Sequence, residues 1–160
     1  MVGLPWKYGR EKAKELLNSI DSRSMATKRS WSLKRSMERV PDKKKKGFTE
    51  MRKFLDHDRA EMIMDDKAND KDEEAPTWHL PSHLVFQKGK YRFCHDGRAA
   101  VNGVCLNDQL IGDLNMLVPL VDPVNNLRHY LYAFGTDIEA FFHNVLVDPE
   151  DHGVFRFFFF

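Results

Sequence analysis

The sequence lacks the features that mark secreted and membrane proteins. No apolar run approaches the roughly 20 residues that span a bilayer, and the opening segment MVGLPWKYGREK has no apolar stretch of the kind found in secretory signals. Only two cysteines occur, Cys94 and Cys105, and they form no C-x-x-C pair. These absences predict a protein that is not secreted, does not enter a membrane, and keeps free thiols in a reducing compartment, the cytoplasm or the nucleus.

The sequence also lacks several common catalytic and metal-binding patterns. It contains no Ser-His-Asp order, glycine-rich phosphate loop or Walker sequence. His79, His83, Cys94 and Cys105 are residue types that bind zinc, but Pro81 breaks the helical spacing that would align the two histidines. A zinc site is therefore not indicated.

The formal net charge of +1 conceals a segregation of charge along the chain. Residues 1–59 hold 17 Lys and Arg against 8 Asp and Glu, residues 60–76 hold 2 against 7, and residues 77–160 hold 6 against 9. A basic front half is the electrostatic footprint of a protein that lies near phosphates. By itself, however, a charge run is more often a solvated surface.

Residues 1–64 are predicted to form a basic helical lead-in. Apolar residues recur every three or four positions in three patterns, which are Ala13, Leu16, Leu17 and Ile20, then Leu33, Met37 and Val40, then Phe48, Met51 and Leu55 with an extension to Met62 and Ile63. Pro41 is expected to end the second helix, and residues 43–46 to form a charged loop. Helices this short are stabilised mainly by packing, so the lead-in is expected to dock on the later part of the chain.

Residues 65–76 are predicted to be a flexible acidic linker, and residues 77–160 a strand-rich region. The chain as a whole is therefore expected to be of the α+β class. Leu84–Phe86 and Tyr91–Cys94 flank the short loop Gln87–Lys90, in which Gly89 suits a hairpin turn.

Three further elements are predicted after the hairpin. A helix is expected to open near Asp113, although Pro119 and Pro123 would interrupt it. Tyr130–Gly135 is predicted to be a buried strand and Val154–Phe160 a last apolar strand, because both runs are aromatic and apolar. We expect the second of these to leave an exposed apolar edge that promotes aggregation.

Asp137 is the first candidate for chemistry, because it would follow the predicted strand Tyr130–Gly135. An acid at the end of a buried strand is fixed in position and suits a divalent cation, and two-metal phosphoryl transfer requires such a ligand. On spacing alone, an aspartate in this position is more often the N-cap of a following helix. Both interpretations stay open at this point.

Lys88, Lys90 and Arg92 form the second candidate site. Alternate residues of a strand point the same way, so the three side chains are predicted to share one face of the hairpin. Three cations on one face suit a triphosphate, since Arg can form paired hydrogen bonds with phosphate oxygens. The alternative is a solvated face of an exposed hairpin.

Taken in order, segments across nearly all 160 residues resemble the N-terminal part of the reverse transcriptase of BEL/Pao-type retrotransposons. Residues 2–7 (VGLPWK) resemble the family's G-L-P-W-K segment, and the helices that follow resemble its helical lead-in. Residues 78–83 resemble its W-x-L-P-x-H motif, and residues 103–108 its G-x-S-L-N-D loop, with Cys105 in place of the serine. Residues 137–143 resemble D-I-E-x-M-F-H, the first acid motif of the polymerase.

The resemblance implies a fold, which is a helical lead-in followed by fingers strands and the first strand–helix segment of a palm. It also implies roles for individual residues. Asp137 would be the first metal-binding catalytic aspartate, with the Ile138 backbone carbonyl as a further ligand of Mg²⁺. Phe142 would pack under the sugar of the nucleotide and exclude a 2′-hydroxyl.

The fingers residues would meet the incoming nucleotide. Arg92 would lie against this deoxynucleoside triphosphate, and Lys90 or Lys88 would bind its phosphates, so that Arg92 and Asp137 face a common cleft. The implied partners are an RNA or DNA template-primer, the deoxynucleoside triphosphate and the rest of a polyprotein.

The sequence departs from the family in one respect that affects activity. Reverse transcriptases place two further aspartates in a Y-x-D-D hairpin, and no such hairpin occurs in these 160 residues. One aspartate cannot hold two metal ions, so we expect a fragment without polymerase turnover of its own. The alternative is a non-catalytic module whose basic helical front half binds nucleic acid or protein.

Overall fold

The computed structural model describes residues 1–63, 75–112 and 118–160, and it confirms the α+β class. Helices α1 (Arg10–Asn18), α2 (Ser22–Glu38) and α3 (Pro41–Asp56) come first, followed by strands β1 (His79–Leu80), β2 (Ser82–Gln87) and β3 (Lys90–His95). The later elements are the 3₁₀ turn η1 (Asn107–Gln109), helix α5 (Val121–Leu127), 3₁₀ helices η2 (Phe141–Asn144) and η3 (Pro149–Phe155), and strand β4 (Arg156–Phe157). Among the described residues, no helix combines the length and apolar character needed to cross a membrane.

The three predicted helices of the lead-in are present, but the boundary between the second and third differs from the prediction. Pro41 begins α3 instead of only ending α2, and the predicted charged loop 43–46 lies inside α3. Proline suits the first helical position because its missing N–H has no partner there. Lysine is a good helix former, and Lys46 pairs with Asp42 one turn earlier at 2.8 Å.

The predicted extension of the third helix to Met62 and Ile63 is wrong. Helix α3 ends at Asp56, and both Met62 and Ile63 are exposed. The predicted linker 65–76 lies mostly outside the described residues. Its end is packed against α1, because Asn18 binds the Ala75 carbonyl and the Thr77 N–H.

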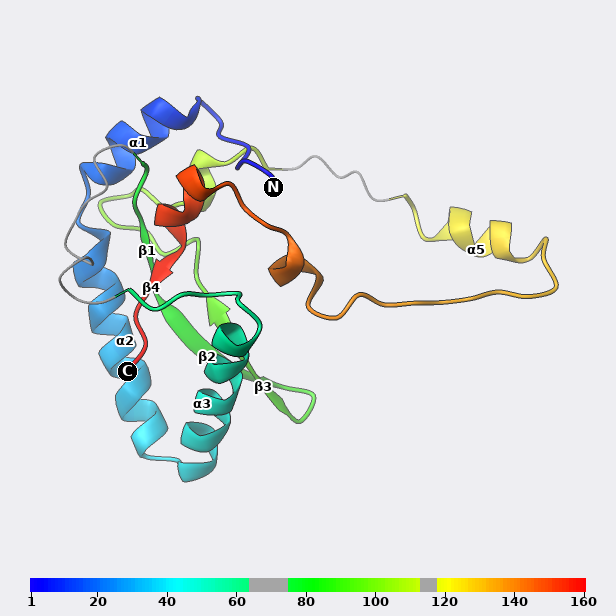
Figure 1. The fold of residues 1–160 in the computed structure, drawn as a ribbon, viewed down its shortest axis with the longest axis horizontal. Coiled ribbons are helices and arrows are strands. Elements are labelled where there is room, and N and C mark those ends of the chain that lie inside the picture. The colour runs from blue at the N-terminus through cyan, green and yellow to red at the C-terminus, as the bar shows by residue number, and fades with distance from the viewer. Residues whose placement is uncertain (64–74, 113–117) are drawn as a thin grey trace.

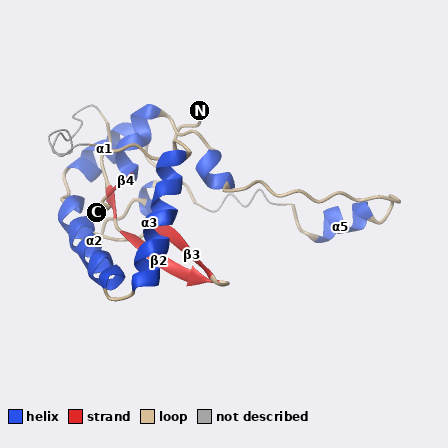
Figure 2. Ribbon diagram, turned by 60° about the horizontal axis from the view of Figure 1, so that its bottom comes forward, coloured by secondary structure: helices blue, strands red, loops and turns tan. Residues whose placement is uncertain are grey.

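The predicted hairpin is confirmed. Strands β2 and β3 pair antiparallel from Ser82 opposite His95 to Gln87 opposite Lys90. Lys88 and Gly89 form the turn with φ of 50° and 75°, and two consecutive positive φ angles define the turn that matches the twist of the strands. The hairpin lies against α2 and α3, which Figure 2 shows on one side of it.

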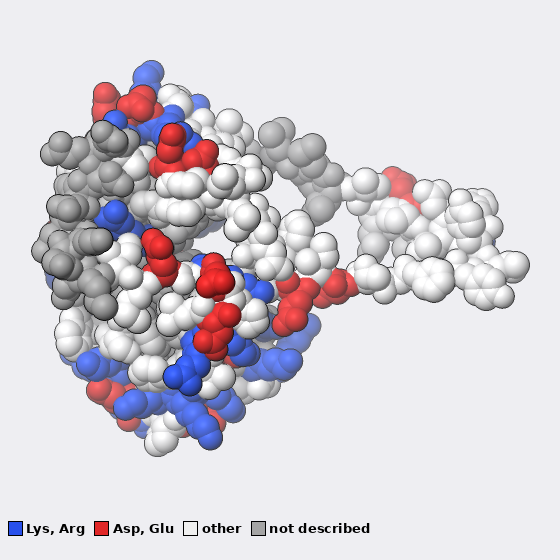
Figure 3. All heavy atoms as spheres, in the orientation of Figure 1, with Lys and Arg blue, Asp and Glu red and all other residues white. Residues whose placement is uncertain are grey.

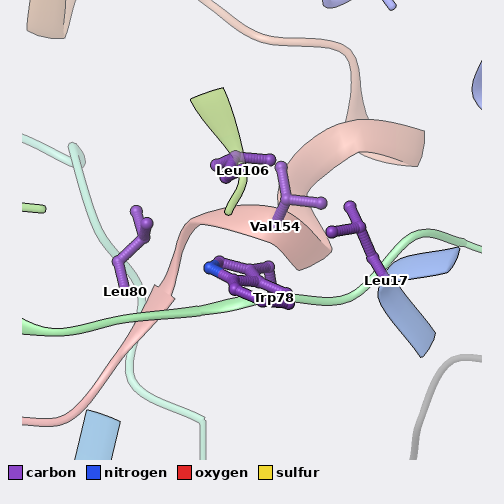
Figure 4. Close-up of a cluster of buried hydrophobic side chains, with 5 residues drawn as sticks. All are labelled: Leu17, Trp78, Leu80, Leu106 and Val154. Carbon is purple, nitrogen blue, oxygen red and sulfur yellow. The ribbon is translucent and has the colours of Figure 1, made fainter. Parts of the chain in front are cut away.

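The first core joins the lead-in to the later part of the chain, as predicted. Leu17 of α1 packs with Trp78, Leu80, Leu106 and Val154, all of them buried (Figure 4). These residues come from four separate segments, so the core forms only when distant parts of the chain meet. The domains expected at 1–64 and 77–160 therefore share one hydrophobic core.

A second core lies between α2, α3 and β3 and receives the end of the chain. Its buried members are Leu33, Met37, Met51 and Phe93, with Phe157 and Phe159 packed against them. The Phe159 ring lies 5.1 Å from Phe48 of α3 and 5.6 Å from Phe93 of β3. The end of the chain is therefore packed against helices, whereas the sequence predicted an exposed last strand.

The prediction of a strand over Val154–Phe160 is correct only at Arg156–Phe157. Val154 and Phe155 belong to η3, and β4 pairs parallel with β1 over two residues. The pairing is short because β1 is followed by Pro81, which has no N–H to donate. Residues 157–160 are half-buried against the helices and do not form the exposed edge that the sequence suggested.

The prediction of a buried strand over Tyr130–Gly135 is wrong. Tyr130, Leu131, Tyr132 and Phe134 are 72–95% exposed and lie in an irregular segment. A buried strand needs neighbouring backbone to satisfy its N–H and C=O groups, and none of the described strands lies beside this run. Figure 1 shows α5 and this segment extending away from the cores. We call residues 118–140 the arm.

The helix predicted to open near Asp113 lies outside the described residues, apart from its end at Val118. Helix α5 begins after Pro119, and it tolerates Pro123 in its first turn because N–H groups there have no partner within the helix. Val118, Leu120 and Val121 are exposed, like the rest of the arm.

Candidate functional site

The three cations assigned to nucleotide binding are all exposed on the hairpin, but they do not share one strand face. Lys90 and Arg92 stand two residues apart on β3 and point the same way. Lys88 belongs to the turn, where its φ of 50° ends the alternation. Arg92 Nη1 donates to Gln87 Oε1 at 3.2 Å, so its guanidinium is held along the hairpin.

Helix α3 brings further cations to the same end of the molecule. Lys46 Nζ lies 5.8 Å from the centre of the Tyr91 ring, next to Lys90. Lys44 and Lys45 precede Lys46 and are exposed. Figure 3 shows Lys and Arg side chains gathered over the end of the body where α2 meets α3 and over the hairpin side.

Asp137 lies in an exposed, irregular part of the arm, so it is neither at a strand end nor at a helix start. The next helical element, η2, has Ala140 as its N-cap, and therefore the interpretation of Asp137 as a helix cap is wrong. No hydrogen bond or ion pair joins its carboxylate to another described residue. Ile138 beside it is also exposed.

Phe142 is 85% exposed and contacts the neighbouring Phe141 ring at 5.6 Å. The following residues attach the arm to the body. His143 packs edge-on against Phe54 of α3 at 5.0 Å, and Asn144 Oδ1 accepts a hydrogen bond from Arg59 at 3.3 Å. The predicted nucleotide-facing role of Phe142 stays a prediction.

Among the residues that the structure describes, 1–63, 75–112 and 118–160, no three His, Cys, Asp or Glu side chains come close enough to hold a metal ion together. Mg²⁺ is usually held by one or two carboxylates together with waters and substrate phosphates. Asp137 and the Ile138 carbonyl would supply part of such a set, so their assignment to Mg²⁺ stays a prediction.

A hollow of about 330 Å³ lies at the other end of the body. It is lined by Lys7, Tyr8, Lys12, Ala13, Leu16, Asp108 and Gln109. Neither Asp137 nor Arg92 contributes to it, so it is not the cleft expected between the fingers and the palm. That the two residues face a common cleft stays a prediction.

Sequence reasoning missed one densely hydrogen-bonded carboxylate among the described residues. Asp151 in η3 is fully buried, and it accepts hydrogen bonds from the Leu4 N–H at 2.8 Å and from Trp6 Nε1 at 3.0 Å. Arg10 donates to both of its oxygens, from Nε at 2.9 Å and Nη2 at 3.2 Å, and also pairs with Glu150. The sequence carries no spacing that links these residues.

Asp151 stays ionised because of its donors. Burial alone would raise the pKa of this carboxyl, but the hydrogen bonds from Leu4, Arg10 and Trp6 outweigh it and lower the pKa below the usual value. The same pair raises the pKa of Arg10. The opening segment is therefore tied to η3 by a partly buried ion pair that holds its charge at neutral pH.

Two histidines, the buried His79 and the half-buried His95, are neutral at physiological pH. Burial, together with the nearby Arg156, lowers the pKa of His79 to about 4. Burial, with a smaller effect of His143, lowers the pKa of His95 to about 4 as well. His79 stacks on Phe158 at 5.5 Å, and His95 lies 4.3 Å from the Phe157 ring, so both contact the end of the chain.

The chain was compared with known protein families, proteins and structures. No protein-family model, no curated protein and no solved structure matches the chain.

Proposed function

We propose that this chain is the opening part of a BEL/Pao-type reverse transcriptase, without polymerase turnover of its own. The observation that supports this proposal is the mutual packing of the segments that resemble the family's motifs. The opening segment runs beside the loop that follows residues 103–108, because the Lys7 N–H donates to the Gln109 carbonyl and the Ile111 N–H to the Pro5 carbonyl, both at 2.8 Å. Trp6 and Leu110 form a bridge between these two hydrogen bonds.

Two other motif-like segments enter the same core. Trp78 and Leu80 of the W-x-L-P-x-H-like segment pack with Leu106 of the G-x-S-L-N-D-like loop. Cys105, which stands where the family has serine, is buried beside Leu106. The motif-like segments therefore form one packed unit, which supports the proposal that they belong to one domain.

The segment that follows the acid-motif-like residues 137–143 is hydrogen-bonded to the opening segment. Val2 N–H donates to the Leu146 carbonyl at 2.8 Å, and the Asp148 N–H to the Val2 carbonyl at 3.0 Å. Asp137 and Phe142 lie just before this attachment. Under the proposal, Asp137 would share Mg²⁺ with carboxylates of a Y-x-D-D hairpin that is not among these residues, and synthesis on an RNA or DNA template would require both.

The discriminating experiment is sequencing of the gene and its transcript beyond the codon for Phe160. We expect the reading frame to continue into a Y-x-D-D hairpin. A stop codon, with no such hairpin in any downstream frame, would instead support the non-catalytic module.

A primer-extension assay tests the catalytic assignment. The 160 residues alone should extend no primer, whereas the chain continued through the hairpin should do so. Asp137→Asn in the longer chain should abolish extension, and Asp122→Asn, an exposed aspartate of α5 outside the motif, should leave it unchanged. Equal activity of the two variants would refute the assignment.

A further inference from the structure

The arm exposes large apolar side chains in a run that has the composition of a strand. Tyr130, Leu131, Tyr132 and Phe134 are 72–95% exposed. No backbone hydrogen bond joins residues 131–138 to other described residues, and Figure 1 shows the chain after α5 running in an extended course back toward the body. Aromatic residues favour strands, so this run is a strand segment that lacks a partner and is open to pairing with another chain.

Helix α5 adds a second apolar surface to the arm. Leu120, Val124 and Leu127 stand four and three residues apart, so they lie on one side of the helix. They are 42–77% exposed. A two-stranded ribbon alone is only marginally stable in water, and a helix with an apolar side is the kind of cover that such a ribbon needs.

The charges at the two ends of the aromatic run are opposite. Arg128 precedes the run, whereas Asp137 and Glu139 follow it, and all three are exposed. If Tyr130–Gly135 pairs antiparallel with the same segment of a second copy, the basic end of each arm lies beside the acidic end of the other. Parallel pairing would place like charges side by side, which is destabilising. The charges therefore favour an antiparallel, two-fold symmetric pair.

Antiparallel pairing about the middle of the run also places large side chains opposite small ones. Tyr130 would lie opposite the partner's Gly135, and Tyr132 opposite the partner's Ala133. The space over Gly135 is open, since a Cβ atom there would meet nothing within 4 Å. An aromatic ring that lies across from a glycine covers its bare backbone and helps to fix the register of a strand pair.

The apolar area of two arms is sufficient for a specific interface. An aromatic side chain buries about 150–250 Å² when it is covered, so the six largely exposed rings of Tyr130, Tyr132 and Phe134 in two copies offer on the order of 1,000 Å². Stable interfaces bury about 1,200–2,000 Å² in total. Leu131 and the apolar side of α5 supply the remaining area.

We propose that the arm binds a second copy of this chain, by antiparallel pairing of Tyr130–Gly135 with the same segment of the partner, and that the two α5 helices cover the resulting ribbon. The interface is two-fold symmetric, so every substitution in the arm acts twice. It involves no metal ion, nucleotide or polynucleotide, so its failure would not bear on the proposed polymerase function.

Sedimentation equilibrium from low to high micromolar concentration tests the proposal. The unaltered chain should pass from a monomer of 18.7 kDa to twice that mass. Arg128→Asp makes both ends of the run acidic and Asp137→Arg makes both ends basic, so each should weaken dimerisation by about tenfold or more. The exchange R128D/D137R should restore the affinity to within about threefold, as expected for coupled charges. An equal mixture of the two single variants should form a heterodimer, because their ends are complementary.

Arg52→Asp is the matched control. Arg52 is an exposed arginine of α3 outside the arm, and its replacement changes the net charge as much as Arg128→Asp does, yet it should leave the dimer unchanged. Phe134→Ser removes one ring from each copy and should weaken dimerisation by about a hundredfold. Circular dichroism of dilute, monomeric samples should show the same helix content for all variants.

Several results would overturn the proposal. A monomer at every concentration, or a series of larger species without a dimer, would show that the arm forms no specific pair. An equal loss in Arg52→Asp would mean that net charge controls association, and an exchange variant that stays monomeric would exclude the antiparallel arrangement. Binding of a monomeric chain to phosphatidylcholine vesicles would identify a lipid surface as the occupant of the arm instead.

Discussion

Arg10 and Asp151 are 141 positions apart in sequence and form a partly buried, doubly hydrogen-bonded ion pair. The pair joins the start of α1 to η3, and Leu4 and Trp6 donate to the same carboxylate. This buried carboxylate is costly to remove, because the half-buried donors Leu4, Trp6 and Arg10 would lose the acceptor that they share. The pair therefore fixes the opening segment to the last third of the chain.

Replacing Asp151 should destabilise the protein strongly. Asp151→Ala leaves the Leu4 and Trp6 N–H groups and part of the Arg10 guanidinium without their acceptor, so the free energy of unfolding should fall by about 1–3 kcal/mol. Urea denaturation followed by circular dichroism measures this change. Glu150→Gln is the control, because Glu150 binds the same arginine from an exposed position and should cost less than about 1 kcal/mol. Similar losses in both variants would contradict the role given to Asp151.

Stability should fall on mild acidification because of His79 and His95. Their pKa values are about 4 in the folded protein against an ordinary value of 6.5, so the unfolded chain binds more protons. Their contribution is complete above pH 6.5 and is lost as the pH falls toward 4, with a slope of up to about 1.4 kcal/mol per pH unit for each histidine.

Urea midpoints measured between pH 7 and pH 4 test this expectation. His95→Phe removes one titrating group from an aromatic environment and should reduce the slope by about half. His129→Gln, at an exposed position on the arm, should leave the slope unchanged. A stability that is flat across this range would refute the burial of the two imidazoles.

Removing residues 157–160 should destabilise the protein, in contrast to the gain in solubility that an exposed edge would predict. The four rings pack on Trp31, Phe48, His79 and Phe93, among others. Full burial of one phenylalanine is worth about 1.5–3 kcal/mol, so four half-buried rings should contribute at least about 3 kcal/mol. The melting temperature should fall by roughly 6 °C or more, and dye binding to exposed apolar surface should rise.

Solubility should instead depend on the arm. Leu131 and Phe134 are 95% and 92% exposed, and exposed apolar residues in a row promote association. Leu131→Ser with Phe134→Ser should reduce aggregation in size-exclusion chromatography while changing the melting temperature by less than about 2 °C, because no packing is lost. Ala26→Ser with Leu33→Ser is the contrasting pair, since both side chains are buried in α2, and it should lower stability.

Local sequence signals predicted those elements whose pattern is carried by residues only a few positions apart. Apolar spacing located α1, α2 and α3, and Gly89 located the hairpin turn, since a turn with positive φ angles favours glycine whatever surrounds it. The misplaced start of α3 has a local cause as well. Pro41 is compatible with both the end of one helix and the first position of the next, and the sequence pattern did not decide between them.

The sequence by itself determined the basic front half, the free thiols and the helical lead-in, because these follow from composition and from residues at most a few positions apart. Only the tertiary structure decided the positions of the two aromatic runs. Residues 157–160 are covered by α2 and α3, whereas Tyr130–Gly135 is left exposed, although the two runs are similar in composition. The difference arises because burial depends on which distant surface is free to receive a side chain. The hydrogen bonds of Asp151 have the same origin, since they join residues that the chain brings together only when it folds.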